Sequence, residues 1–188
     1  MMSWRGNFGV ALVCAMSSVM SVPARSAAED VSGALGGHLL IADGDIGGAL
    51  LLDVWGAFDW LRIGGFVGVG AIPSERDASN RVLMPFGISA AAHLSMGDSV
   101  ALQLRARGGL WAGSTQSEKL TFGGLFGGGA YLGIVLGHGA LLSFGADVWS
   151  IIASDAWRTP MGPDDAVSAS TWVIAPGVGF SWTPESGE

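Results

Sequence analysis

The chain has 188 residues, of which 49% are hydrophobic and only 13% are charged. Soluble domains carry about 25% charged residues, so this composition indicates contact with lipid or an unusually buried fold. Lys and Arg number 9 against 16 Asp and Glu, a net charge of -7, which argues against a nucleic-acid-binding protein because such proteins present basic surfaces. The length suits a single domain.

Residues 1–28 have the features of an export signal. Arg5 supplies a positive charge, residues 9–22 form an apolar core, and the Ser-Ala-Ala at 26–28 offers small residues for cleavage. We therefore predict a signal peptide over 1–28 and one outer-membrane domain over 29–188. An N-terminal membrane anchor is the alternative, which the shortness of the apolar run disfavours.

Cysteine chemistry and cofactors are not expected. Cys14, the only cysteine, lies inside the predicted signal, and Val13 before it is unsuited to a lipoprotein acceptor site. The mature chain is therefore expected to have no disulfide and no cysteine-bound metal. Because it also has no glycine-rich phosphate loop, no HExxH sequence and no clustered His and Asp residues, we predict neither a metal nor a cofactor.

Side-chain alternation with a period of two predicts strands. In 100–114 the even positions are mostly apolar, whereas Gln103, Arg105 and Arg107 share the odd positions. A helix would scatter these three side chains around its circumference, and a strand places them on one face. GxxxG patterns at 124–128 and 129–133 suggest packed membrane helices, but in a chain with 31 glycines such matches are uninformative.

The same alternation recurs in eight segments, each long enough to cross a bilayer as a tilted strand: 31–41, 46–58, 61–72, 82–95, 99–114, 120–136, 140–153 and 170–183. The connections alternate between short turns (58–60, 96–98 and 137–139) and longer polar loops (73–81, 114–119 and 154–169), with 42–45 as a short exception. Short turns on the periplasmic side and longer loops outside are typical of outer-membrane barrels. We therefore predict an all-β, eight-stranded, antiparallel up-and-down transmembrane β-barrel.

The composition of the second strand face decides which face points inward. It consists of Gly, Ala and Ser with a few large residues, and the only lysine, Lys119, lies in a loop. A water-covered sheet would be rich in Lys and Glu. We therefore expect this face to line a narrow lumen, and side chains such as Leu104 and Phe144 to face lipid. A soluble secreted barrel or sandwich is the alternative.

Aromatic residues fall near the ends of the predicted strands, where the two bilayer interfaces would lie. Phe58, Trp60, Phe180 and Trp182 mark the periplasmic side, and Phe122 and Trp172 the outer side. Amphipathic rings favour the headgroup layer, so this placement supports a membrane barrel.

Eight alternating strands after a signal, tight inner turns and a final Val-x-Phe-x-Trp strand (178–182) resemble the small outer-membrane barrel superfamily, which includes the OmpA transmembrane domain and OmpX. The resemblance covers nearly the whole mature chain. It implies a monomer in the bacterial outer membrane that contacts outer-membrane lipids and lipopolysaccharide and is inserted by the barrel insertion machinery. One departure is TPESGE at 183–188, since the last strand of this superfamily usually ends the chain on an aromatic residue.

The inward positions contain most of the polar side chains of the predicted strands. From them we predict a lumen charge network, since unpaired buried charges cost several kcal/mol: Asp53, Arg62, Arg105, Arg107, Asp147, His38, His93 and Tyr131. Ser89, Gln103, Ser143 and Trp149 also point inward. Turns centred on Gly97 and His138 would pair Arg105 with Ser89 and Asp147 with Gly129.

The side chains of an eight-stranded barrel are just sufficient to fill its interior. We therefore predict a salt-bridged, mostly closed lumen and a structural or surface-interaction role without catalysis. A narrow channel for small solutes is the alternative. In the longest outer loop, Trp157 is a candidate for contact with an extracellular ligand of unknown kind.

An enzyme is the third possibility. Some small outer-membrane barrels are lipid A deacylases with a His-x-Ser pair, and His93-Leu94-Ser95 has that spacing. This segment lies beside a periplasmic turn, however, whereas lipid A lies in the outer leaflet. No acid is placed to orient the imidazole, so we do not expect catalysis.

A closed barrel predicts heat-modifiable migration in gel electrophoresis. The refolded chain should migrate differently when it is not boiled, because detergent alone does not open a sheet without free edges. Identical migration of boiled and unboiled samples would contradict a barrel.

Overall fold

The computed structural model describes residues 30–42, 45–58, 60–74, 79–114, 120–137, 139–152 and 170–182. They form eight strands: β1 (Asp30–Ala42), β2 (Asp45–Phe58), β3 (Leu61–Ser74), β4 (Ser79–Ser95), β5 (Val100–Ser114), β6 (Leu120–Gly137), β7 (Ala140–Ile152) and β8 (Ser170–Trp182). The predicted strands are confirmed, and no predicted end lies more than three residues from the observed one. Within these ranges no helix is long and apolar enough to cross a membrane. The predicted signal at 1–28 lies outside the described residues.

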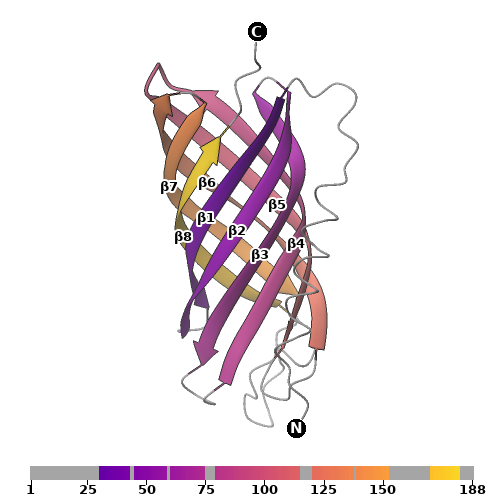
Figure 1. The fold of residues 1–188 in the computed structure, drawn as a ribbon. Coiled ribbons are helices and arrows are strands. Elements are labelled where there is room, and N and C mark those ends of the chain that lie inside the picture. Colours follow the sequence, from indigo (N-terminus) through magenta and orange to yellow (C-terminus); the bar gives the residue numbers. More distant parts are fainter. Residues whose placement is uncertain are drawn as a thin grey trace, which may run out of the picture.

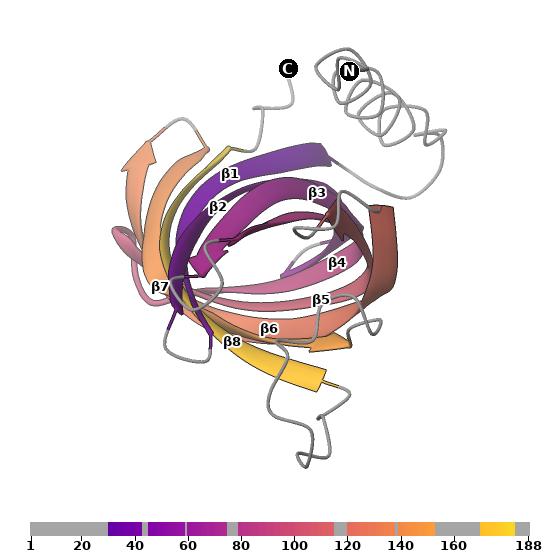
Figure 2. The ribbon, with the colours of Figure 1, turned by 90° about the horizontal axis from the view of Figure 1, so that it is seen from below.

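The strands form a single closed barrel in chain order, with β8 paired to β1 (Figures 1 and 2). Every neighbouring pair is antiparallel. Closure matters because a sheet edge exposes backbone amides and carbonyls that lipid cannot hydrogen-bond. The all-β, eight-stranded, up-and-down fold is therefore confirmed.

The two ends of the barrel differ in their connections. The turn end, at the top of Figure 1, carries the short connections 58–61, 95–100 and 137–140 together with the start of β1 and the end of β8. The opposite end carries the other connections and is called the loop end. Gly97 and Gly137, at the turn end, have φ values of 100° and 93°, a backbone conformation that glycine adopts without the steric cost borne by other residues.

One predicted register is wrong by two residues. The last pair before the β4–β5 turn is Ser95 with Ala101, and the amide of Met96 donates to the carbonyl of Val100 at 2.8 Å. The turn is therefore centred on Asp98 and not on the residue before it, which shifts every pair of these strands by two. As a result Arg105 lies opposite Ala91, and Arg107 takes the place opposite Ser89.

The β6–β7 register agrees with the prediction, since Asp147 lies opposite Gly129. The assignment of faces is also confirmed. Leu104 and Phe144 are 44% and 49% exposed on the outside, whereas Arg105 is 5% exposed and Asp147 is fully buried inside.

Apolar side chains, most of them large, fill the lumen toward the loop end. They form one buried cluster: Leu40, Ala42, Ala49, Leu51, Phe66, Ile72, Leu83, Trp111, Leu125, Trp149, Ile151, Val173 and Ala175. From the sequence we expected an inward face of mainly small and polar residues, and this cluster was not predicted. Its members alternate along the strands in step with the polar lumen residues, so both sets point inward. The lumen is therefore apolar toward the loop end and ionic in its middle.

The exposed apolar belt predicts how the barrel tolerates charge on its outside. Val148, near the middle of β7, is 44% exposed, and Leu136, beside the turn end, is 56% exposed. Because an arginine on the lipid face costs about 2–4 kcal/mol at the bilayer midplane and about 0–1 kcal/mol near its interfaces, Val148→Arg should lower the free energy of unfolding much more than Leu136→Arg. Denaturant unfolding in liposomes measures both. Equal effects would contradict a membrane belt at this position.

Candidate functional site

Arg107 lies at the centre of the polar part of the lumen. From β5 its Nη2 and Nε donate to Oδ2 and Oδ1 of Asp53 on β2 at 2.8 and 3.2 Å. Its Nη1 donates to Oδ2 of Asp147 on β7 at 2.5 Å. Neither β2 nor β7 is a neighbour of β5 in the barrel, so the guanidinium crosses the lumen and ties two distant parts of the wall together. All three side chains are almost fully buried, and the paired contact with Asp53 is the strong, directional form of the ion pair.

Two further side chains converge on Asp147. The hydroxyl of Tyr131 on β6 donates to its Oδ2 at 2.7 Å. Nδ1 of His38 on β1 lies 3.9 Å from the same oxygen, 3.5 Å from the Tyr131 hydroxyl and 3.5 Å from the carbonyl oxygen of Ala175. One carboxylate oxygen thus gathers groups from β1, β5 and β6, which gives the network a centre that holds several strands in fixed relation.

Arg105 is held differently from Arg107. Its Nη2 donates to Oε1 of Gln103 at 2.7 Å and lies 3.5 Å from the Ser143 hydroxyl, which donates to a backbone carbonyl of β8. Its Cζ lies 4.3 Å from the ring centre of Tyr131 and 5.8 Å from that of Trp55. Cation–π contacts strengthen when they are desolvated, so aromatic faces and neutral oxygens hold this buried cation.

Glycines opposite the large lumen side chains make room for them. A Cβ at Gly129 would collide with the carbonyl oxygen of Ala146 and the carboxylate of Asp147, and one at Gly177 would overlap the carbonyl oxygen of Gly37 and the His38 ring. Interior positions of β6 and β8 are therefore kept small where the network projects from the neighbouring strands.

Six of the eight predicted network residues meet at this site, and Arg62 and His93 lie toward the turn end. Arg62 on β3 and Arg105 lie on either side of Ala91, and Arg62 has contacts of its own. His93 is half-buried, and its Nδ1 has no hydrogen-bond partner among the described residues. Trp157, the predicted loop contact, lies outside the described residues.

Two aromatic side chains that were not among the predicted lumen residues border the network. Nε1 of Trp55 donates to the hydroxyl of Ser89 at 2.8 Å, and the Phe66 ring lies 5.8 Å from Cζ of Arg107. Trp55 shares its strand parity with Asp53, so alternation alone would have identified it as a lumen residue.

The arrangement offers ion pairing and rigidity. In the part of the chain that the structure describes, no group of three or more His, Cys, Asp and Glu side chains could hold a metal ion. The buried hydroxyls of Ser89 and Ser143 engage the Trp55 indole and a carbonyl of β8. Both contacts serve packing.

Comparison with known proteins supports the fold. No protein-family model and no curated protein matches the sequence. Among solved structures, Neisserial surface protein A matches with a TM-score of 0.58 and 15% identity, covering 81% of this chain and 95% of that one. A major outer membrane protein from Thermus thermophilus matches with a TM-score of 0.46 and 12% identity, and the outer membrane enzyme PagL with a TM-score of 0.42 and 14% identity. Each match covers 81% of this chain and 98% of the other. The chain has the fold of the small eight-stranded outer-membrane barrels.

The network predicts a large effect of Asp147→Ala. Removing one partner of a buried ion pair typically costs about 3–5 kcal/mol, because the remaining charge is left uncompensated. Asp98→Ala, in the exposed turn between β4 and β5, is the control and should change stability little. Heat unfolding in detergent, followed by the loss of the unboiled gel form, measures both variants. Unchanged heat resistance of Asp147→Ala would contradict a structural role for the network.

Proposed function

We propose that this chain, which has the fold of the small outer-membrane barrels, is a closed, non-catalytic barrel in the outer membrane of a diderm bacterium, with a structural or surface-interaction role. The observation that carries the proposal is Arg107, which spans the lumen between Asp53 and Asp147. A guanidinium held by two buried carboxylates leaves the middle of a narrow barrel little freedom to open.

Two successive layers support a closed lumen. The ionic network occupies the middle, and the apolar cluster with Leu51, Phe66, Trp111 and Trp149 fills the lumen toward the loop end. An ion crossing this path would displace the network and then shed its water among apolar side chains, which is energetically costly.

The alternative of a narrow channel is supported by the polar character of the central lumen, with Gln103, Arg105 and Ser143 beside the network. These side chains bond to one another, and Gln103 and Arg105 are at most 5% exposed. Pairing and burial favour a plug.

The enzyme alternative rests on His93-Leu94-Ser95. Ser95 ends β4 at the turn end, His93 is half-buried, and no described side chain hydrogen-bonds its Nδ1. A histidine that acts as a base toward a serine needs a group that orients its ring. Its surroundings therefore support a non-catalytic role.

The surface-interaction part of the proposal rests on the long sequence between β7 and β8, which contains Trp157 and joins strands at the loop end. With the turn end, where β1 starts and β8 ends, on the periplasmic side, this end faces the outside of the cell. Outer-membrane lipids and lipopolysaccharide then cover the apolar belt of a monomer, and the barrel insertion machinery delivers it.

The proposal predicts silence in single-channel recording. The refolded protein, checked by its unboiled gel migration, should give no steady conductance in planar bilayers, whereas a general porin in the same membrane conducts. Steady openings from the wild-type chain would overturn the closed lumen and favour the channel.

Catalysis is tested with purified lipopolysaccharide. Mass spectrometry of lipid A after incubation should show unchanged acyl chains. Loss of an acyl chain that disappears in His93→Ala would overturn the non-catalytic assignment.

A further inference from the structure

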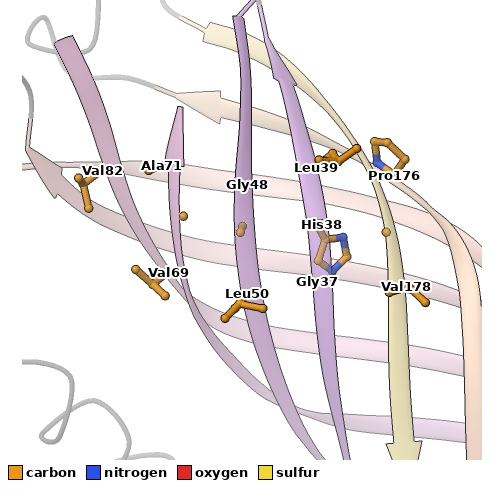
Figure 3. A pocket seen from close by; sticks show the side chains of 13 residues that line it. Gly37, His38, Leu39, Gly48, Leu50, Val69, Ala71, Val82, Pro176 and Val178 are labelled. Atoms are coloured by element: carbon orange, nitrogen blue, oxygen red, sulfur yellow. The ribbon is translucent and has the colours of Figure 1, made fainter. Parts of the chain in front are cut away.

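The outer wall of the barrel is hollowed from β8 across β1, β2 and β3 to Val82 on β4. This hollow, called the wall groove, has a volume of about 840 Å³ (Figure 3). Exposed side chains of Leu39, Leu50, Val69 and Val178 stand around it, and small or compact residues form its floor: Gly37, Gly48, Ala71 and Pro176. The hollow is shallow and open to the outside over most of its extent.

The strand registers explain the shape of the wall groove. Gly37 lies between Val178 on β8 and Leu50 on β2, and Gly48 lies between Leu39 on β1 and Ala71 on β3. Side chains of a sheet alternate between its faces, so all of these residues project outward. The first row thus has a gap between two large side chains, and the second has a gap formed by Gly48 and Ala71 beside Leu39. The two gaps lie next to each other because Gly37 and Gly48 are on the adjacent strands β1 and β2.

The wall does not require glycine at these two positions. A Cβ at Gly48 would meet nothing closer than the carbonyl oxygen of His38 at 3.7 Å, and a Cβ at Gly37 would meet Leu50 Cδ2 at 3.9 Å. At Gly47 and Gly64, by contrast, a Cβ would collide with the neighbouring backbone. Close packing therefore explains Gly47 and Gly64, whereas Gly37 and Gly48 leave space on the outside.

The seam between β1 and β8 adds a second feature. Pairing runs to His38 with Gly177 and resumes at Ile41 with Ile174. Pro176 lies in this interval and has no amide to donate. Nδ1 of His38 instead lies 3.5 Å from the carbonyl oxygen of Ala175. His38 borders the groove at this point, but its ring belongs to the lumen network and is only 5% exposed.

We propose that the wall groove binds an acyl chain of lipid A. The groove is continuous with the exposed apolar belt, which in a membrane barrel faces hydrocarbon, so its occupant is an acyl chain. It lies toward the loop end, since Gly48 follows the start of β2 by three residues and Ala71 precedes the end of β3 by three. In the orientation of the proposed function, on which this inference rests, that half of the barrel is in the outer leaflet, where lipopolysaccharide is the lipid.

A chain lying in the wall groove would touch both its floor and the side chains that stand around it, whereas a chain on a smooth belt would touch a single surface. Dispersion contacts are weak singly and add up along a chain, so the groove should retain one lipid that the rest of the belt does not. Leucine at position 48 would fill the floor and remove this difference without disturbing the wall, because its Cβ has room.

The test is native mass spectrometry of the refolded full chain in detergent micelles, titrated with purified hexa-acylated lipid A. The wild type should retain one lipid A molecule as the detergent is removed, and Gly48→Leu should bind it about tenfold more weakly. Gly108→Leu is the matched control, since a Cβ there meets nothing within 4 Å and its strand, β5, lies in the opposite wall. This variant should bind like the wild type.

Equal retention of lipid A by the wild type and Gly48→Leu would overturn the proposal. A loss of lipid A binding in Gly108→Leu as large as that in Gly48→Leu would also overturn it. Equal retention of phosphatidylethanolamine by the wild type would overturn lipid A as the source of the chain. Gly37→Leu provides a second filling variant if Gly48→Leu fails to give the unboiled gel form. Conductance does not enter this test, so an open lumen would contradict the closed-barrel function and leave the groove assignment standing.

Discussion

The need to hydrogen-bond every backbone amide and carbonyl without water is the constraint on which this structure depends. Within lipid, a sheet meets it only by closing on itself, and here closure requires β8 to pair with β1. Eight strands then enclose a lumen that the barrel's own side chains can fill. The burial of Arg107 and the proximity of groups from five strands both follow from that narrowness.

Burial changes what charged residues do in this protein. At an exposed position Arg107 and Asp147 would contribute little to stability, but inside the barrel each would be costly without the other. The network therefore restricts which arrangements of the wall are allowed. The apolar cluster toward the loop end works differently, since it fills space without directional bonds, and together the two regions close the lumen by different physical means.

The outside of the barrel is less uniform than its role as a lipid-facing surface requires. Glycine at 37 and 48 leaves the wall hollow where larger residues would fit, and Pro176 interrupts pairing at the seam beside it. The seam is also where closure joins the two ends of the sheet. A lipid chain in the wall groove would cover this interrupted stretch, so the groove assignment links lipid contact to the closure on which the fold depends.

Alternation along single strands determined much of this protein from the sequence alone. It placed Arg105, Arg107 and Asp147 on one face and Leu104 and Phe144 on the other, because side chains of a strand alternate whatever it pairs with. Partners between strands depend on turn geometry, which is why Arg105 was paired with Ser89 instead of Ala91. Contacts between strands that are not neighbours, such as Arg107 with Asp53, and the hollow formed by Gly37 and Gly48 depend on all the registers and on closure together. Only the tertiary structure decided these, because no pattern within one strand records how strands meet around a barrel.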